Sequence, residues 1–136
     1  AKEAAEEGEV PVGAVVVLDG KIVGAGRNRR EISKNALAHA EIEAINEACR
    51  TLGGWRLWQC DMYVTLEPCP MCTGAIINSR IKRLVYGASD YKAGSCGSVV
   101  DLFSLPYNHK PEVVSGVMQE ECAALLTDFF KKLRKK

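Results

Sequence analysis

The sequence has little of what membrane-spanning, secreted or repetitive proteins depend on. Among its 136 residues, no apolar run approaches the ~20 residues that a transmembrane helix needs. The charged, alanine-rich beginning, A-K-E-A-A-E-E-G-E, is unlike a secretory signal peptide. It has no starting methionine, so we expect the chain to begin inside a trimmed first helix. We find no internal repeat, linker or low-complexity segment.

Cysteines are too few for a disulfide scaffold. There are six in the chain, and two of them, Cys69 and Cys72, form a C-x-x-C pair. In a chain without a secretion signal, that spacing indicates metal binding or redox chemistry. We therefore expect a cytoplasmic protein in which the C-x-x-C pair binds metal or takes part in redox chemistry.

Neither sign of charge dominates. The net charge of +1 gives no overall positive field that would indicate a nucleic-acid partner. Basic residues nevertheless gather in three clusters, at Arg27–Arg30, Arg80–Arg83 and Lys131–Lys136. Each cluster alone is most simply explained as solvated surface. Three clusters on one face would form a surface that follows a phosphate backbone.

Hydrophobic periodicity indicates strands that alternate with helices. Strands are predicted at Val12–Leu18, Lys21–Asn28, Asp61–Leu66, Arg83–Ala88 and Val113–Val117. Helices are predicted over residues 1–8, from Ala38 to Leu52, from Pro70 to Ser79 and from Met118 to the end, with a short helical piece around Val99–Leu105. Asp19-Gly20 between two β-branched runs predicts a hairpin. This order predicts an α/β fold in a single domain, residues 1–136, with helices on both faces of a sheet.

Three potential metal ligands fall at the starts of two predicted helices. His39 begins one helix, and Cys69 and Cys72 begin another. The partial positive charge of a helix N-terminus favours the thiolate, which is the form of cysteine that binds metal. Two cysteines three residues apart on a first helical turn can share one ion.

The number of ligands separates structural from catalytic zinc sites, because structural zinc has four protein ligands and catalytic zinc keeps one position for water. His39, Cys69 and Cys72 make three. A fourth ligand could still come from Cys49, Cys60, Cys96, Cys122 or His109, although none of them lies at a ligand-like spacing. Glu41 lies two positions after His39, where a carboxylate can take a proton from a zinc-bound water.

The pattern H-A-E followed by P-C-P-M-C resembles the H-x-E…P-C-x-x-C signature of zinc nucleoside and nucleobase deaminases. From Glu9 to Phe130 the chain is also similar to the bacterial tRNA-specific adenosine deaminases, in segments such as E-V-P-V-G-A-V-V-V and E-C-A-A-L-L-T-D-F-F. It departs from their commonest pattern at Arg30, where a proline is frequent.

The resemblance implies a cytidine-deaminase-like fold, a three-layer α-β-α sandwich around a mixed five-stranded sheet. It implies hydrolytic deamination of adenosine to inosine at the wobble position of tRNA anticodons, in a homodimer with one zinc ion per subunit. His39, Cys69 and Cys72 would hold zinc, and Glu41 would be the catalytic acid and base. The substrate contacts that it implies are Asn28, Asp90, Lys92, His109 and Phe130.

Several aromatic and apolar residues have simpler structural explanations. We expect one of Phe129 and Phe130 in the core, and Trp55 and Trp58 as buried anchors. His109 also fits a surface or capping histidine. An apolar helix face that would serve either a dimer interface or the core comprises Met71, Ala75 and Ile76.

Two other classes of protein stay open. A free-base deaminase for guanine or cytosine would use the same zinc chemistry, although the basic C-terminal helix favours a polynucleotide substrate. A structural-zinc binding module or a C-x-x-C redox protein would leave Glu41 and the remaining similarity unexplained. A structural-zinc module would unfold on chelation, and a redox dithiol would show redox-dependent cysteine labelling.

Overall fold

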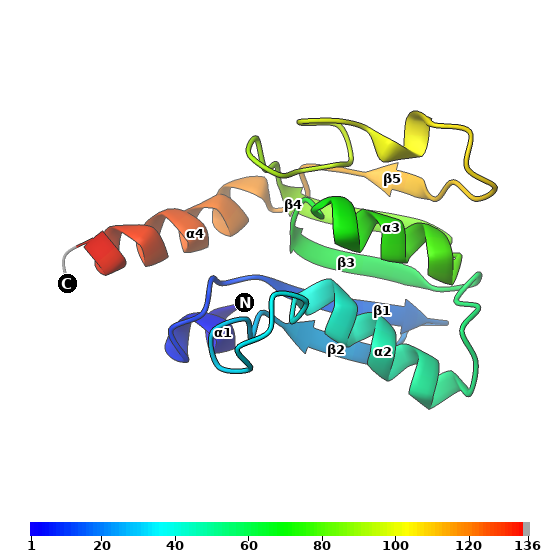
Figure 1. Ribbon diagram of the computed structural model, residues 1–136, viewed down its shortest axis with the longest axis horizontal. Helices are drawn as coiled ribbons and strands as arrows, with labels where there is room; N and C mark the ends of the chain where they lie inside the picture. The colour runs from blue at the N-terminus through cyan, green and yellow to red at the C-terminus, as the bar shows by residue number, and fades with distance from the viewer. Residues whose placement is uncertain (135–136) are drawn as a thin grey trace.

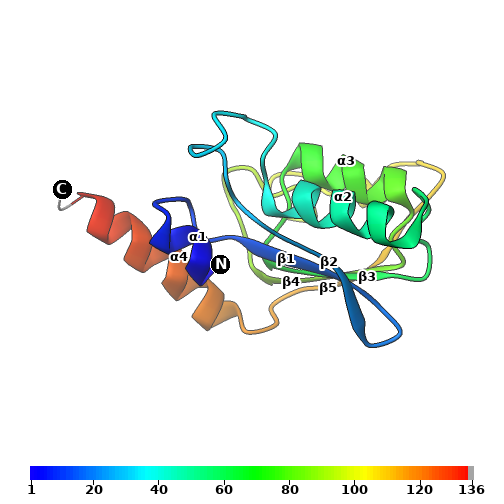
Figure 2. The same ribbon diagram turned by 90° about the horizontal axis from the view of Figure 1, so that it is seen from below.

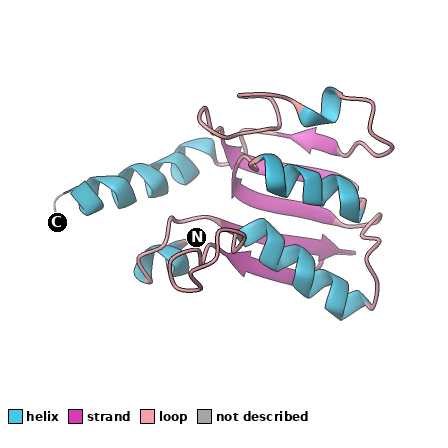
Figure 3. Cartoon of the chain, viewed as in Figure 1, coloured by secondary structure: helices cyan, strands magenta, loops and turns pink. Residues whose placement is uncertain are grey.

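Strands and helices follow one another in the predicted order in the computed structural model, which describes residues 1–134 (Figures 1 and 3). The strands are β1 (Gly13–Leu18), β2 (Lys21–Arg27), β3 (Asp61–Leu66), β4 (Arg83–Ala88) and β5 (Glu112–Val114). The helices are α1 (Lys2–Glu6), α2 (Ala40–Leu52), α3 (Pro70–Ser79) and α4 (Gln119–Arg134), with a 3-10 turn, η1 (Leu102–Ser104). Lys135 and Lys136 of the C-terminal basic cluster lie outside the described residues.

The sheet is mixed, with the strand order β2-β1-β3-β4-β5. β1 pairs antiparallel with β2 and with β3, whereas β3, β4 and β5 are parallel. Asp19 and Gly20 join β1 to β2 with φ values of 50° and 76°, as a type I′ hairpin turn requires. β2, β3 and β4 therefore run in the same direction, and their carboxyl ends meet at one edge of the sheet.

Helices cover both faces of the sheet, as predicted (Figure 2). α2 and α3 lie side by side on one face, over a core that contains the fully buried Val16, Met62 and Leu84. α4 packs on the other face against β4 and β3, and its Cys122 lies over Gly87. No helix within residues 1–134 is long and apolar enough to span a membrane.

Glycines on β2 allow α2 to lie directly on the sheet. The small residues Ala40, Ala44 and Ala48 recur every four positions and present one face of α2 to Gly24 and Gly26. A Cβ at Gly26 would overlap the carbonyl oxygen of Ala40 and come within 2.8 Å of the Ala44 nitrogen. The height of α2 above the sheet therefore depends on glycine at these two positions.

Replacing Gly26 with alanine is expected to destabilise the protein by about 1–3 kcal/mol, because α2 must move away from β2 to admit the methyl group. Gly54→Ala is the matched control, since a Cβ there meets no atom within 4 Å. Denaturant unfolding of both variants measures the difference. Equal unfolding free energies for the two variants would show that α2 can shift away from β2 without loss of stability.

The fifth strand is shorter than predicted. It ends at Val114 rather than Val117, because the backbone turns away from the extended conformation at Gly116, whose φ is 78°. The helical piece expected around Val99–Leu105 is a single 3-10 turn, capped by the Asp101 carboxylate, which accepts from the Phe103 N–H at 3.0 Å.

Predictions of burial for the aromatic residues were wrong. Trp55 and Trp58 are 51% and 61% exposed, and the Arg56 guanidinium lies 4.4 Å above the Trp55 ring. Neither Phe129 nor Phe130 is buried, since most of α4 extends beyond the sheet (Figure 1). Their rings pack edge to face against each other at 5.3 Å. Ile76 of the apolar face on α3 is fully buried and belongs to the core.

Candidate active site

Two helices begin at the edge where β2 and β3 end (Figure 1). His39 is the N-cap of α2 and Cys69 is the N-cap of α3, both with extended backbone. Pro70 occupies the first turn of α3, where its missing N–H is not needed. The positive ends of both helix dipoles are therefore directed at the same small region.

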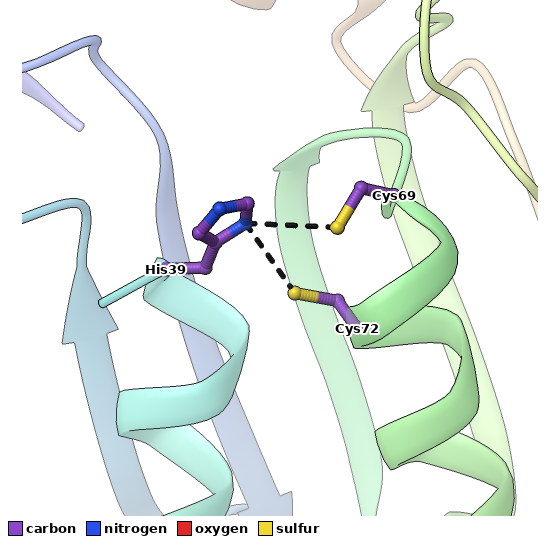
Figure 4. A group of neighbouring side chains, drawn as sticks. All are labelled: His39, Cys69 and Cys72. Carbon is purple, nitrogen blue, oxygen red and sulfur yellow. Dashed lines mark hydrogen bonds between the residues drawn. The ribbon is translucent and has the colours of Figure 1, made fainter. Parts of the chain in front are cut away.

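The three predicted metal ligands come together there (Figure 4). The His39 Nδ1 atom lies 3.7 Å from the Cys69 Sγ and 3.6 Å from the Cys72 Sγ. A tetrahedral zinc ion, with bonds of ~2.05 Å to nitrogen and ~2.3 Å to sulfur, separates such atoms by about 3.6 Å. Two thiols and one imidazole at this separation fit zinc in both donor type and spacing.

No fourth ligand joins this group within residues 1–134. Of the candidates considered from the sequence, Cys96 lies beside Thr73, with 3.4 Å between the Cys96 Sγ and the Thr73 Oγ1. Cys49 packs at the margin of the core, and Cys60 is buried within it. Three protein ligands leave a tetrahedral position for water, which is the arrangement of catalytic rather than structural zinc sites.

Protonation of the three side chains also suits a cation. A hydrogen bond from Cys72 lowers the pKa of Cys69 to about 4, with a further contribution from His39. The same bond, together with burial, raises the pKa of Cys72. The hydrogen bond to Cys69 raises the pKa of His39. The protein thus holds a thiolate beside a thiol whose proton a divalent ion can replace.

Glu41 lies inside the first turn of α2, and its side chain is 4% exposed. Burial raises the pKa of its carboxyl to about 7, against opposing hydrogen bonds from its backbone N–H and from Cys72. A carboxyl group of this pKa, next to the metal ligands, can both accept and donate a proton at neutral pH.

Asn28 is the predicted substrate residue that the fold brings to this centre. It follows the end of β2 and is 8% exposed. Its Oδ1 atom accepts a hydrogen bond from the Ala40 N–H at 3.0 Å, directly after His39. This bond fixes the orientation of the carboxamide, whose NH₂ group is then the end available to donate.

Asp90 and Lys92 lie in the loop that follows β4. The Asp90 Oδ1 atom accepts from the backbone N–H groups of Lys92 at 3.0 Å and Ala93 at 3.3 Å. Asp90 therefore shapes its own turn, whereas the Lys92 side chain is exposed. The loop reaches the start of α3, because the Ser95 N–H donates to the Pro68 carbonyl at 2.9 Å.

His109 and Phe130 are not brought to the centre within this chain. The His109 Nε2 atom lies 2.6 Å from the Ile81 carbonyl oxygen, just beyond the far end of α3. That end is about 15 Å from the metal ligands, the length of a ten-residue helix. Phe130 belongs to the later turns of α4, a helix of which the greater part projects past the sheet in Figure 1. Contacts of these two residues with RNA stay predictions.

Two of the basic clusters lie at opposite edges of the sheet. Arg27–Arg30 follows β2 at the edge of the active site, but Arg80–Arg83 precedes β4 at the opposite edge. Arg27 is also neutralised by Glu3 at 3.0 Å and Glu7 at 2.5 Å. These two clusters therefore do not form one continuous phosphate-following surface within a single chain.

Two buried carboxylates near the site were missed from the sequence. Glu9 accepts from the backbone N–H groups of Glu31 at 3.1 Å and Ile32 at 2.7 Å, in the loop before His39. Glu67 accepts from the loop after β4. Burial raises the pKa of Glu67, but hydrogen bonds from Ser98 and the backbone outweigh it and hold the pKa below its usual value. Only the position of Glu67 directly before P-C-P-M-C could have signalled it.

Comparisons with known proteins identify relatives of this site and fold. Residues 1–134 match the family model of the MafB19-like deaminases. The tRNA-specific adenosine deaminase of Bacillus subtilis is 51% identical over 100% of this chain and 85% of its own length. A structure from a study of A-to-I editing by tRNA:A34 deaminases at the wobble position of tRNA has a TM-score of 0.89 and 48% identity, covering 92% of this chain and 91% of that one.

A more distant neighbour is the guanine deaminase from Nitrosomonas europaea, with a TM-score of 0.72 and 25% identity over 94% of this chain and 76% of that one. The fold is therefore shared by deaminases that act on different substrates. The 48% sequence identity to the structure from the tRNA:A34 deaminase study is about twice the 25% identity to the guanine deaminase. With half of its residues identical to a relative along the full chain, this protein belongs to the family of tRNA-specific adenosine deaminases.

Proposed function

We propose that this protein hydrolyses the 6-amino group of adenosine at the wobble position of tRNA anticodons, and so produces inosine and ammonia. The chemistry is supported by three ligands with an open fourth position beside a buried carboxyl group. The choice of substrate is supported by one observation above all, the 48% identity and TM-score of 0.89 to the structure from the tRNA:A34 deaminase study.

His39, Cys69 and Cys72 are the residues that would hold zinc. Bound there, zinc would supply a water molecule with a pKa lowered from 15.7 toward ~7. The two helix N-termini favour the thiolate ligands and orient them. Burial of Cys72 and Glu41 keeps competing solvent out of this part of the site.

Glu41 is the proton carrier in this proposal. Its carboxylate takes a proton from the attacking water and returns it to N1 of adenine, and it then carries the remaining hydroxyl proton from the oxygen on C6 to the departing amine. The water oxygen becomes bonded to C6, the C6–N bond breaks, and one ammonia leaves for each water consumed. A pKa of about 7 suits a group that must act in both directions.

Asn28 is proposed to hold the target nucleotide. The base must leave its stack before its C6 atom can enter the active site, and an anticodon loop requires less unstacking than a duplex. With its oxygen engaged by the Ala40 N–H, the Asn28 amide can donate its N–H groups to the extruded nucleotide. Lys92, exposed on the loop after β4, can meet the RNA backbone.

The experiment that tests this function measures inosine in an anticodon stem-loop with adenosine at the wobble position, by mass spectrometry of the digested RNA. A stem-loop with guanosine at that position is the matched control, and free adenosine, guanine and cytosine are assayed in parallel. We expect inosine in the RNA and no deamination of the free compounds. Conversion of guanine or cytosine alone would move the protein to the free-base deaminases, whose fold it shares.

A homodimer and a cytoplasmic location also remain predictions from the family resemblance. A structural-zinc module or redox dithiol has less support, because neither role uses a carboxyl group such as Glu41, buried next to the ligands.

A further inference from the structure

Glu67 has an unusual set of partners for a residue that takes no part in the proposed chemistry. It lies two positions before Cys69, and its side chain is 1% exposed. Its Oε1 atom accepts from the Asp90 N–H at 3.1 Å and the Ser98 hydroxyl at 2.5 Å. Its Oε2 atom accepts from the N–H groups of Cys96 at 3.0 Å and Ser98 at 3.1 Å.

All four donors belong to one loop, residues 89–98, which follows β4. A carboxylate has about four lone-pair positions, so this loop uses the whole accepting capacity of Glu67. Because the group is buried, none of the four bonds can be replaced by water without rearrangement. The carboxylate thus holds the beginning and the end of the loop at the same time.

Two further contacts attach the loop to the same turn. The Ser95 N–H donates to the Pro68 carbonyl at 2.9 Å, next to Cys69. A Cβ at Gly94 would lie 2.6 Å from the Glu67 Oε1 atom, so only glycine lets the loop pass this close to the carboxylate. Loop 89–98 is therefore joined to the turn of residues 67–69 through a side chain, a carbonyl group and a glycine.

The two joined segments carry different parts of the site. The turn ends in the ligand Cys69, and the loop presents Lys92 to solvent from a turn closed by Asp90. We propose that Glu67 is a positioning residue, which sets the substrate-binding loop 89–98 at a fixed distance from the metal ligands. This role rests on the proposed function, since RNA is the substrate that the loop would bind.

Glu67→Gln tests the role, because the amide replaces one accepting oxygen with a donor. On the Oε1 side this leaves the Asp90 N–H without its acceptor, and on the Oε2 side it leaves the Cys96 and Ser98 N–H groups without theirs. We expect KM for the anticodon stem-loop to rise about tenfold, with kcat and zinc content within about twofold of the original protein. Hydrogen exchange is expected to accelerate either at the Asp90 amide or at the Cys96 and Ser98 amides. Ser98→Ala removes one of the four bonds and should raise KM about threefold. If Glu67→Gln does not fold, the KM of Ser98→Ala tests the role instead.

Asp61→Asn is the matched control. It breaks the 2.8 Å pair between Asp61 and Arg83 at the opposite edge of the sheet and should leave KM unchanged. An unchanged KM in Glu67→Gln, or unchanged exchange at all three of the Asp90, Cys96 and Ser98 amides, would overturn the role. A fall in both kcat and zinc content at constant KM would also overturn it, because Glu67 would then stabilise only the turn of residues 67–69 that carries Cys69. Absence of inosine with the original protein would instead overturn the proposed function.

Discussion

Glu41→Gln is expected to reduce kcat for the stem-loop by about 10²–10⁴-fold, the usual contribution of a positioned acid–base group. Glutamine fills the same space but cannot move a proton between water, N1 and the leaving amine. Zinc should stay bound at one ion per chain, because the candidate ligand group found within residues 1–134 comprises His39, Cys69 and Cys72 and does not include Glu41. KM should change little, because the lost interaction acts mainly in the transition state.

Stability provides a second readout for the same variant. The Glu41 side chain is buried and its pKa is raised mainly by burial, so the charged form is held at a cost in folding free energy. Glu41→Gln should therefore unfold at the same or a higher denaturant concentration than the original protein. Glu47→Gln, at an exposed position further along α2, is the control and should retain full turnover. Normal turnover by Glu41→Gln with zinc bound would show that another group carries the proton.

Cys72→Ser is expected to abolish both zinc binding and deamination. Cys72 is fully buried, and a serine hydroxyl there cannot supply the sulfur ligand that zinc would need at this position. Metal analysis of the purified variant should give a zinc content near zero, and the inosine assay should give no product above background. Circular dichroism should still report a folded chain, because a core of sheet and helices does not depend on the metal in the way that a zinc finger does.

Cys96→Ser is the matched control for that result. Cys96 is also buried, but its Sγ atom lies beside Thr73 and outside the ligand group. It should retain one zinc per chain and normal activity. Zinc retained by Cys72→Ser, or lost by Cys96→Ser, would mean that the ligand set differs from the one described. Unfolding of Cys72→Ser with loss of its helical signal would instead favour a structural zinc site.

Several elements were predicted from the sequence with their bounds correct. β3, α3 and β4 begin and end at the predicted residues. Their signals are local: a short β-branched or apolar run, a proline that opens a helix, and a change of hydrophobic period. The Asp19-Gly20 turn is equally local, since its two residues tolerate the positive φ values that the hairpin needs.

Burial on α4 and after α2 could not be predicted in the same way. An apolar stripe shows which side of a helix would pack, but not whether another element lies opposite. Phe130 stays 43% exposed because α4 leaves the sheet after its first turns, and Trp58 stays 61% exposed after α2 ends. Exposure depends on the relative placement of elements far apart in the chain.

The residues of the site also differ in whether the sequence could predict them. His39, Cys69, Cys72 and Glu41 could be predicted because their chemistry is in their side chains and their spacing is short within each helix start. Glu9 and Glu67 could not, because their partners are backbone N–H groups more than 20 positions away, which every residue type except proline provides.

The sequence by itself therefore determined the order of strands and helices and the family, and it predicted the ligands and the acid–base group. The tertiary structure alone decided that two helix starts meet at one sheet edge, with 3.6 and 3.7 Å between the ligand atoms. It also placed two of the basic clusters at opposite edges of the sheet and joined loop 89–98 to the turn of residues 67–69. The physical reason is that side-chain chemistry is encoded residue by residue, whereas distance and burial arise only when the parallel and antiparallel strands fix where each segment lies.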